Sequence, residues 1–203
     1  MNTATELDLA HMLPGFADPV HDAQRGFRCV LDALSRPGRL FDMTVDVTPP
    51  PGLAPAQCAA LLTLADCDTP VWLEPGLRDA AAGHYLRFHC GCPLAADFAD
   101  AHFVVLAGLG ALPQRSALKL GDPCYPDRSA TVLVEVPELE HGGPIRLRGP
   151  GIADVQAISV GGWTARTTAF LHENRAAFPL GVDLLLSCGG RLMGLPRTTI
   201  VEV

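Results

Sequence analysis

Two short segments of the sequence hold the side chains best suited to bind an anion. Arg87 and His89 lie two residues apart in the first, and Asp183 and Arg197 lie in the second, on either side of an apolar run and a Gly-Gly turn. The guanidinium fork of arginine matches the oxygens of phosphate and phosphonate groups. These four residues predict an arginine-lined site for a phosphonate or a nucleotide. Polar residues of these types also cap strands and form turns, and the sequence leaves both interpretations open.

The first segment also contains the ligand types of a zinc site, namely His89, Cys90 and Cys92. A structural zinc ion needs four ligands, usually from two paired motifs, and no second Cys/His pair stands at a clear spacing. The residues that could complete a set from a distance are His102, Cys124 and His141. Packed thiols at the end of a strand are the better interpretation, and we predict no metal site.

Asp66 and Asp68 stand two residues apart, just before Pro70. Two such carboxylates repel each other unless a cation or a partner's arginine lies close. Aspartate also bonds its own backbone and begins turns before proline. The sequence leaves open whether the pair holds a cation or forms a turn, and the turn is favoured.

Lys119 is the only lysine in the chain, so it is the single candidate for a Schiff base with pyridoxal phosphate. Its surroundings are typical of a polar loop, where the amine is solvated, and we predict no cofactor. The sequence also lacks a GxxxxGK[ST] loop, a GxSxG elbow and an HExxH motif. No Ser/His/Asp or Cys/His pairing can be assigned from spacing, and we predict no catalytic residue.

Composition narrows the class of protein. The chain has 203 residues, of which 48% are hydrophobic, and its formal net charge is −7. Counterion release on nucleic acid needs a basic face, so the charge argues against such a partner. The seven cysteines are an odd number and lie in apolar surroundings, as reduced thiols usually do. The opening residues lack an apolar signal segment, and no apolar run is long enough to span a membrane. We therefore expect a cytoplasmic globular protein that does not bind a membrane.

Hydrophobic periodicity predicts the elements that must position these residues. Helices are expected at 18–36, 55–65 and 164–177, and strands at 39–45, 71–73, 103–107 and 155–160. Residues 85–90 are predicted to be extended, 130–148 to form a hairpin, and 182–203 to supply three strands at the middle of a sheet. Residues 108–129 are expected to be irregular. The pattern predicts one α/β domain over 1–203, with residues 1–17 as a surface arm.

In the first predicted helix, the apolar residues that recur at helical spacing are Val20, Ala23, Phe27, Val30, Leu31 and Leu34. The other side holds His21, Asp22, Arg25, Arg28 and Asp32. An apolar stripe of this kind normally faces the core. We expect the same of the last helix, where the stripe consists of Thr167, Phe170, Leu171 and Asn174.

Motifs along nearly the whole chain resemble the PhnH family, a subunit of the bacterial carbon–phosphorus lyase system. The resemblance rests on the residues 22–24, 27–28, 35–38, 61–66, 68–73, 86–89, 147, 149, 151–152, 178–183, 188–189, 196–199 and 201–203, which occur in the family's order. Cys90 and Cys92 lie outside this pattern, which further weakens the zinc interpretation.

The resemblance implies an α/β fold with a mixed central sheet flanked by helices, similar to the large domain of pyridoxal-phosphate-dependent transferases, without the cofactor or its lysine. It implies a subunit, without activity of its own, that contributes to making α-D-ribose 1-methylphosphonate 5-triphosphate from ATP and methylphosphonate. The implied partners are the PhnG, PhnI and PhnJ subunits, with PhnL for this step, and a second copy when the subunit is isolated. A stand-alone phosphonate- or nucleotide-binding enzyme is the alternative.

Overall fold

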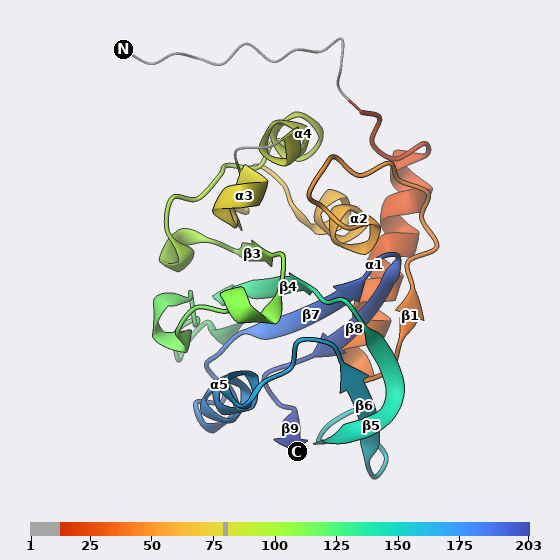
Figure 1. Ribbon diagram of the computed structural model, residues 1–203. Helices are drawn as coiled ribbons and strands as arrows, with labels where there is room; N and C mark the ends of the chain where they lie inside the picture. Colours follow the sequence, from red (N-terminus) through yellow and green to blue (C-terminus); the bar gives the residue numbers. More distant parts are fainter. Residues whose placement is uncertain (1–12, 79–80) are drawn as a thin grey trace.

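The computed structural model describes residues 13–78 and 81–203, which fold into an α/β arrangement with two sheets (Figure 1). The larger sheet has six strands in the order β1-β8-β7-β4-β3-β2, and the smaller has the order β6-β5-β9. The helices are α1 (Pro19–Ser35), α2 (Pro55–Leu64), α3 (Pro75–Arg78), α4 (Ala81–Cys90) and α5 (Ala165–Ala176). The strands are β1 (Phe41–Asp42), β2 (Val71–Leu73), β3 (Phe103–Leu106), β4 (Thr131–Glu135), β5 (Leu139–Arg148), β6 (Gln156–Val160), β7 (Asp183–Cys188), β8 (Arg191–Leu195) and β9 (Ile200–Glu202).

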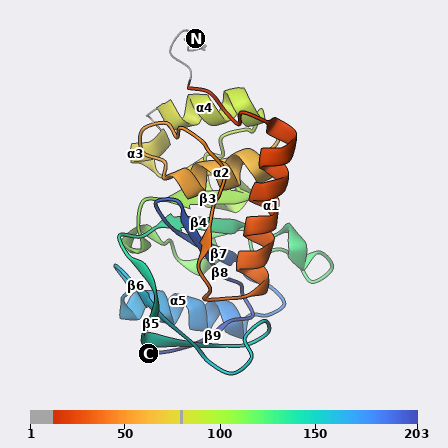
Figure 2. The same cartoon turned by 90° about the vertical axis from the view of Figure 1, so that its right-hand side faces the viewer.

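The middle of the large sheet is covered on both faces. Strands β2, β3, β4 and β7 run parallel, while β8 and β1 are antiparallel additions. Successive residues such as Val104 and Val105, or Leu184 and Leu185, belong to the two opposite cores. Helices α1 to α4 lie over one face, and α5 with the small sheet lies over the other (Figures 1 and 2). The mixed sheet flanked by helices is therefore confirmed.

The last helix and the closing strands follow the sequence pattern. In α5, the buried residues are Thr167, Phe170, Leu171 and Asn174, which is the predicted stripe. Strand β7 is apolar on consecutive residues and lies inside the large sheet, and Gly189 takes a φ of 60° in the turn that leads to β8. The third closing strand, β9, pairs instead with β5 in the small sheet.

Two predicted elements are wrong. Residues predicted as the extended segment 85–90 lie in α4, because the alternation of apolar and polar residues there coincides with a helix whose Tyr85 and Leu86 are buried. The predicted hairpin over 130–148 does not form, since β4 pairs in parallel with β3 and β7, whereas β5 pairs with β6 and β9. The predicted strand at 39–45 is reduced to the two residues of β1.

Helix α1 has the predicted boundaries, but only part of its predicted apolar stripe faces the core: Val30 is buried and Leu34 packs against the core. Asp18 caps it by accepting a hydrogen bond from the His21 amide at 3.1 Å, and Pro19 occupies the first turn. Its buried residues are Asp22, Gly26, Val30 and Ala33, while Val20, Phe27 and Leu31 are exposed. The expected apolar core stripe was therefore wrong for these three residues.

Candidate functional site

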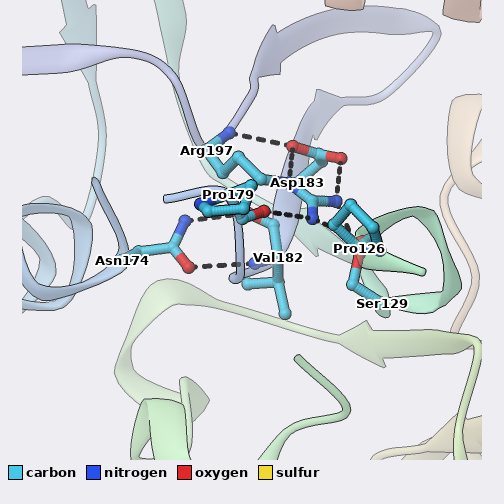
Figure 3. Close-up of polar contacts among 7 residues, drawn as sticks. All are labelled: Pro126, Ser129, Asn174, Pro179, Val182, Asp183 and Arg197. Carbon is cyan, nitrogen blue, oxygen red and sulfur yellow. Dashed lines mark hydrogen bonds and ion pairs between the residues drawn. The ribbon is translucent and has the colours of Figure 1, made fainter. Parts of the chain in front are cut away.

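Arg197 and Asp183 meet where β7 begins and form a compact polar cluster (Figure 3). The Arg197 side chain donates to Asp183 Oδ1 through Nε at 3.2 Å and to Oδ2 through a terminal nitrogen at 2.7 Å. The same carboxylate accepts the Arg197 amide at 2.8 Å. The two side chains are 12% and 23% exposed, so this bidentate pair is largely shielded from water.

The remaining donors of Arg197 are engaged as well. One terminal nitrogen donates to the carbonyls of Pro126 and Pro179 at 2.8 and 3.3 Å, and the other donates to Ser129 Oγ at 2.5 Å. All five guanidinium N–H groups thus have acceptors within the chain. The cluster joins the loop before β4, the turn before β7 and the loop after β8, and an anion could reach Arg197 only by displacing one of them.

Asn174 of α5 reinforces the same region from the helix side (Figure 3). Its amide donates to the Val182 carbonyl at 2.8 Å, and its carbonyl accepts the Val182 amide at 2.9 Å. Both residues are buried, so this pair satisfies backbone groups that water cannot reach. The start of β7 is consequently fixed from two sides, by Asn174 and by Arg197.

Arg87 and His89 lie on α4, and the contacts of Arg197 do not include them. His89 donates through Nε2 to the Leu13 carbonyl at 2.9 Å, and its ring lies 4.4 Å from that of Tyr85. Arg87 lines a pocket of about 460 Å³ together with Arg78 and His84. The structure thus brings together Asp183 and Arg197 of the predicted anion set, and it places Arg87 and His89 on a separate helix.

Sequence reasoning missed a second polar pair at the amino edge of the parallel strands. His102 precedes β3 directly, and its Nε2 accepts a hydrogen bond from the Lys119 ammonium. Partial burial, and then the positive charge of Lys119, lower the pKa of His102 below its ordinary value. Lys119 is half-buried rather than solvated, which corrects the expectation of an exposed lysine. A histidine immediately before an apolar strand was the only signal in the sequence.

His102 and Ser129 share a pocket of about 300 Å³, whose remaining lining residues are Thr69, Phe103, Asp127, Arg128 and Thr131. Because Ser129 also accepts a hydrogen bond from Arg197, this pocket adjoins the Arg197 cluster. Its lining contains one acid and one arginine, which gives it no strong preference for anions.

The carboxyl edge of the parallel strands, where many α/β proteins bind ligands, is occupied by internal hydrogen bonds. Glu135 accepts from Ser187 Oγ at 2.5 Å and from the Gly189 amide at 2.8 Å. Gln57 donates to the Leu106 carbonyl at 3.1 Å, and Glu74 accepts the Ala107 amide at 2.8 Å. These side chains cap strands and loops, and their polar atoms point to neighbouring backbone.

The other sequence candidates have structural roles. Asp66 Oδ1 accepts from the Asp68 amide at 3.0 Å and from Thr69 Oγ1 at 2.9 Å, which confirms the turn. Cys92 is buried and Cys90 is half-buried, and burial raises the pKa of the neighbouring Cys58 thiol to about 11. Among the described residues, no three His, Cys, Asp or Glu side chains are grouped to hold a metal ion.

The fold and the candidate site together define the class of the protein. It is an α/β domain whose clustered polar side chains mainly form hydrogen bonds with its own backbone. The sequence matches the model of the family described as "Bacterial phosphonate metabolism protein (PhnH)" over residues 14–202, and the chain belongs to that family.

Two curated relatives agree with this membership. The chain is 40% identical over 187 residues to the "Alpha-D-ribose 1-methylphosphonate 5-triphosphate synthase subunit PhnH" of Rhizobium meliloti (strain 1021), covering 92% of this chain and 94% of the relative. It is 31% identical over 185 residues to HtxG of Stutzerimonas stutzeri, whose name describes it provisionally as a C–P lyase subunit. That match covers 89% of this chain and 86% of the relative.

Proposed function

We propose that this chain is an auxiliary subunit of a carbon–phosphorus lyase system, contributing to the synthesis of α-D-ribose 1-methylphosphonate 5-triphosphate from ATP and methylphosphonate. The observation that carries the proposal is the 40% identity, over 92% of the chain, to a protein named as a subunit of that synthase. Similarity over nearly the full length of both proteins supports a shared role more strongly than a match to one motif.

The subunit contributes without catalysing the reaction. The polar contacts described above support this part of the proposal, because Arg197, Asp183, Glu135 and Gln57 all bond within the chain. A catalytic group needs a free face toward its substrate. Ser187, whose hydroxyl bonds the Glu135 carboxylate, is fully buried and has no free face toward a substrate.

The proposed fold, partners and location follow from membership of the same family. The chain forms one domain over 1–203, with the fold of the large domain of pyridoxal-phosphate-dependent transferases but no cofactor. Residues 1–12 of the expected surface arm lie outside the described residues, while Leu13 and Phe16 pack against the core. Its partners are the PhnG, PhnI and PhnJ subunits, with PhnL, and it pairs with itself when isolated. It acts in the cytoplasm; no helix among the described residues is long and apolar enough to cross a membrane.

Reconstitution tests the proposal. The sister subunits of the system are purified with and without this chain and supplied with ATP and methylphosphonate, and product formation is followed by ³¹P NMR. We expect the chain to co-purify with the sister subunits and the product to form only when it is present. Full synthesis in its absence would contradict the proposed role.

The alternative, a stand-alone phosphonate or nucleotide enzyme, draws its support from the basic pocket of Arg78, His84 and Arg87. Calorimetric titration of the isolated chain with methylphosphonate and ATP separates the two functions. Micromolar binding that is lost in Arg87→Ala, accompanied by turnover, would favour the alternative.

A further inference from the structure

A basic pocket of about 460 Å³ lies between the end of α3 and the outer side of α4, and we name it the α3–α4 pocket. The two helices lie side by side in both views of the molecule (Figures 1 and 2). Arg78 stands at the end of α3, and His84 and Arg87 lie about one turn apart on α4. These three side chains gather nitrogen donors at one place in a chain whose formal net charge is −7.

Contacts on the inner side of α4 fix the direction of the two side chains that it contributes. Tyr85 and His89 each donate a hydrogen bond to a backbone carbonyl of the segment 13–14, at 3.0 and 2.9 Å. These bonds hold one side of the helix against the chain. His84 and Arg87 are three residues apart and exposed, so they share the other side and face the pocket together.

Gly83 keeps the end of α3 close to α4. It is buried, and a Cβ atom at this position would lie 3.1 Å from the Arg78 carbonyl and 3.1 Å from the Leu94 side chain. A larger residue would therefore press against both neighbours of the helix. Arg78 consequently lines the same pocket as the side chains of α4, with Pro93 and Leu94 as an apolar wall.

We propose that the α3–α4 pocket binds the 5-triphosphate group that ATP and α-D-ribose 1-methylphosphonate 5-triphosphate have in common. The inference rests on the proposed function, which supplies these two molecules. Each guanidinium group donates paired N–H groups to phosphate oxygens, and the imidazole adds a further donor. A pocket of this volume is within the range of small-molecule sites and has room for more than one phosphate group. A triphosphate can therefore reach Arg78, His84 and Arg87 at once.

The α3–α4 pocket differs from the Arg197 cluster in what its donors face. The donors of Arg197 are taken by acceptors of the chain itself, whereas Arg78 and Arg87 are exposed at the surface of a hollow. The residues described along its lining are basic, apolar or glycine. An anion that enters thus meets attractive charge from the lining, and the pocket holds its ligand without making or breaking a bond.

Calorimetric titration of the full chain at about 50 mM salt, where screening is weak, tests the site with four probes: tripolyphosphate, ATP, adenosine and methylphosphonate. We expect tripolyphosphate and ATP to bind with similar affinity and adenosine not to bind. Methylphosphonate should bind at least about tenfold more weakly than tripolyphosphate, because it reaches fewer donors. The ribose methylphosphonate triphosphate from the reconstituted reaction should displace ATP.

Substitutions locate the donors. Arg78→Gln and Arg87→Gln should each weaken tripolyphosphate binding at least about tenfold, the effect of losing one charge-assisted hydrogen bond. Arg146→Gln is the matched control, since it removes the same charge from an exposed arginine of β5, in the small sheet. It should bind tripolyphosphate like the wild type.

NMR of the wild-type chain keeps the inference falsifiable if a variant fails to fold. Tripolyphosphate should shift the backbone amide signals of residues 83–94 and leave those of 126–131, beside the Arg197 cluster, in place. Several results would overturn the inference: no binding at about 1 mM ligand, adenosine binding as tightly as ATP, or methylphosphonate binding as tightly as tripolyphosphate. So would ATP that the product does not displace, an equal loss in Arg87→Gln and Arg146→Gln, or amide shifts outside 83–94 alone.

The outcomes separate this inference from the proposed function. A chain that is needed for synthesis in the reconstituted system but does not bind tripolyphosphate would contradict the α3–α4 pocket alone. A chain that binds tripolyphosphate through Arg78 and Arg87, while the sister subunits make the full amount of product without it, would contradict the proposed function and leave the pocket standing.

Discussion

Replacing Arg197 by alanine tests whether the Arg197 cluster stabilises the fold or binds an anion. The substitution leaves Asp183 without its bidentate partner and removes the donors to Pro126, Pro179 and Ser129. Breaking a buried ion pair costs about 3–5 kcal/mol, whereas an exposed pair is worth about 0–1 kcal/mol. The Arg197 and Asp183 side chains are 12% and 23% exposed, so the pair lies nearer the buried limit than the exposed one. We therefore expect the free energy of unfolding to fall by about 2–4 kcal/mol.

Urea denaturation and thermal melting measure this loss. For a chain of this length a loss of 1 kcal/mol lowers the melting temperature by about 2–4 °C, so Arg197→Ala should melt about 5–15 °C lower than the wild type. Arg197→Lys keeps the charge but loses the fork, and it should recover less than half of the difference. Arg148→Ala is the control, since Arg148 is 43% exposed and pairs with the exposed Asp154 and Glu202.

An Arg197→Ala protein as stable as the Arg148→Ala control would refute a structural role for the cluster. If that variant also lost the binding of phosphate or ATP, Arg197 would belong to an anion site, as the sequence alone allowed. A stability loss without any change in anion binding supports the structural assignment.

Three further predictions concern other described contacts. Asn174→Ala leaves the buried amide and carbonyl of Val182 without partners and should lower the free energy of unfolding by about 2–4 kcal/mol in urea titrations; a neutral effect would mean that these groups find water. The His102 pKa, followed by NMR, should lie below 6.5 and rise in Lys119→Met, because the variant removes a nearby positive charge; an unchanged pKa would exclude the contact. Burial raises the pKa of Cys58 from 9.0 to about 11, so the neutral thiol favours the folded state and this stabilisation disappears as the pH rises from about 9 to about 11. Cys58→Ala should flatten that alkaline loss in unfolding measurements at pH 8 and 10.5, and an equal loss in both proteins would argue against it.

The sequence predicted correctly those helices and strands whose buried residues can be identified from the spacing of apolar residues within the element itself. The stripe of α5 and the apolar run of β7 each specify a buried face without reference to distant residues. The large sheet could therefore be expected to be covered on both sides, while its mixed character was implied by the family resemblance. The pairing partners of β4 and β5 could not, because alternation shows which residues are buried but not which sheet receives the strand.

The orientation of α1 depends on contacts between residues far apart in the sequence. The large apolar residues were expected inside, but the close approach of Gly26 to Thr63 and of Ala33 to Gly194 decides which face is buried. Small residues permit this approach without adding to an apolar pattern, so periodicity alone placed Val30 correctly but not Val20, Phe27 and Leu31. The candidate site has the same limit, since the sequence names Arg197 and Asp183 but not the backbone carbonyls that occupy the guanidinium.

The central claim is that this chain supports a phosphonate-processing assembly and does not carry out the chemistry. Incubating the isolated protein with ATP and methylphosphonate, and following the phosphorus species by ³¹P NMR before and after adding the sister subunits, tests it most directly. The account predicts unchanged substrates for the chain alone and formation of the ribose methylphosphonate triphosphate once the assembly is complete. Sustained conversion of methylphosphonate by the isolated chain would contradict it.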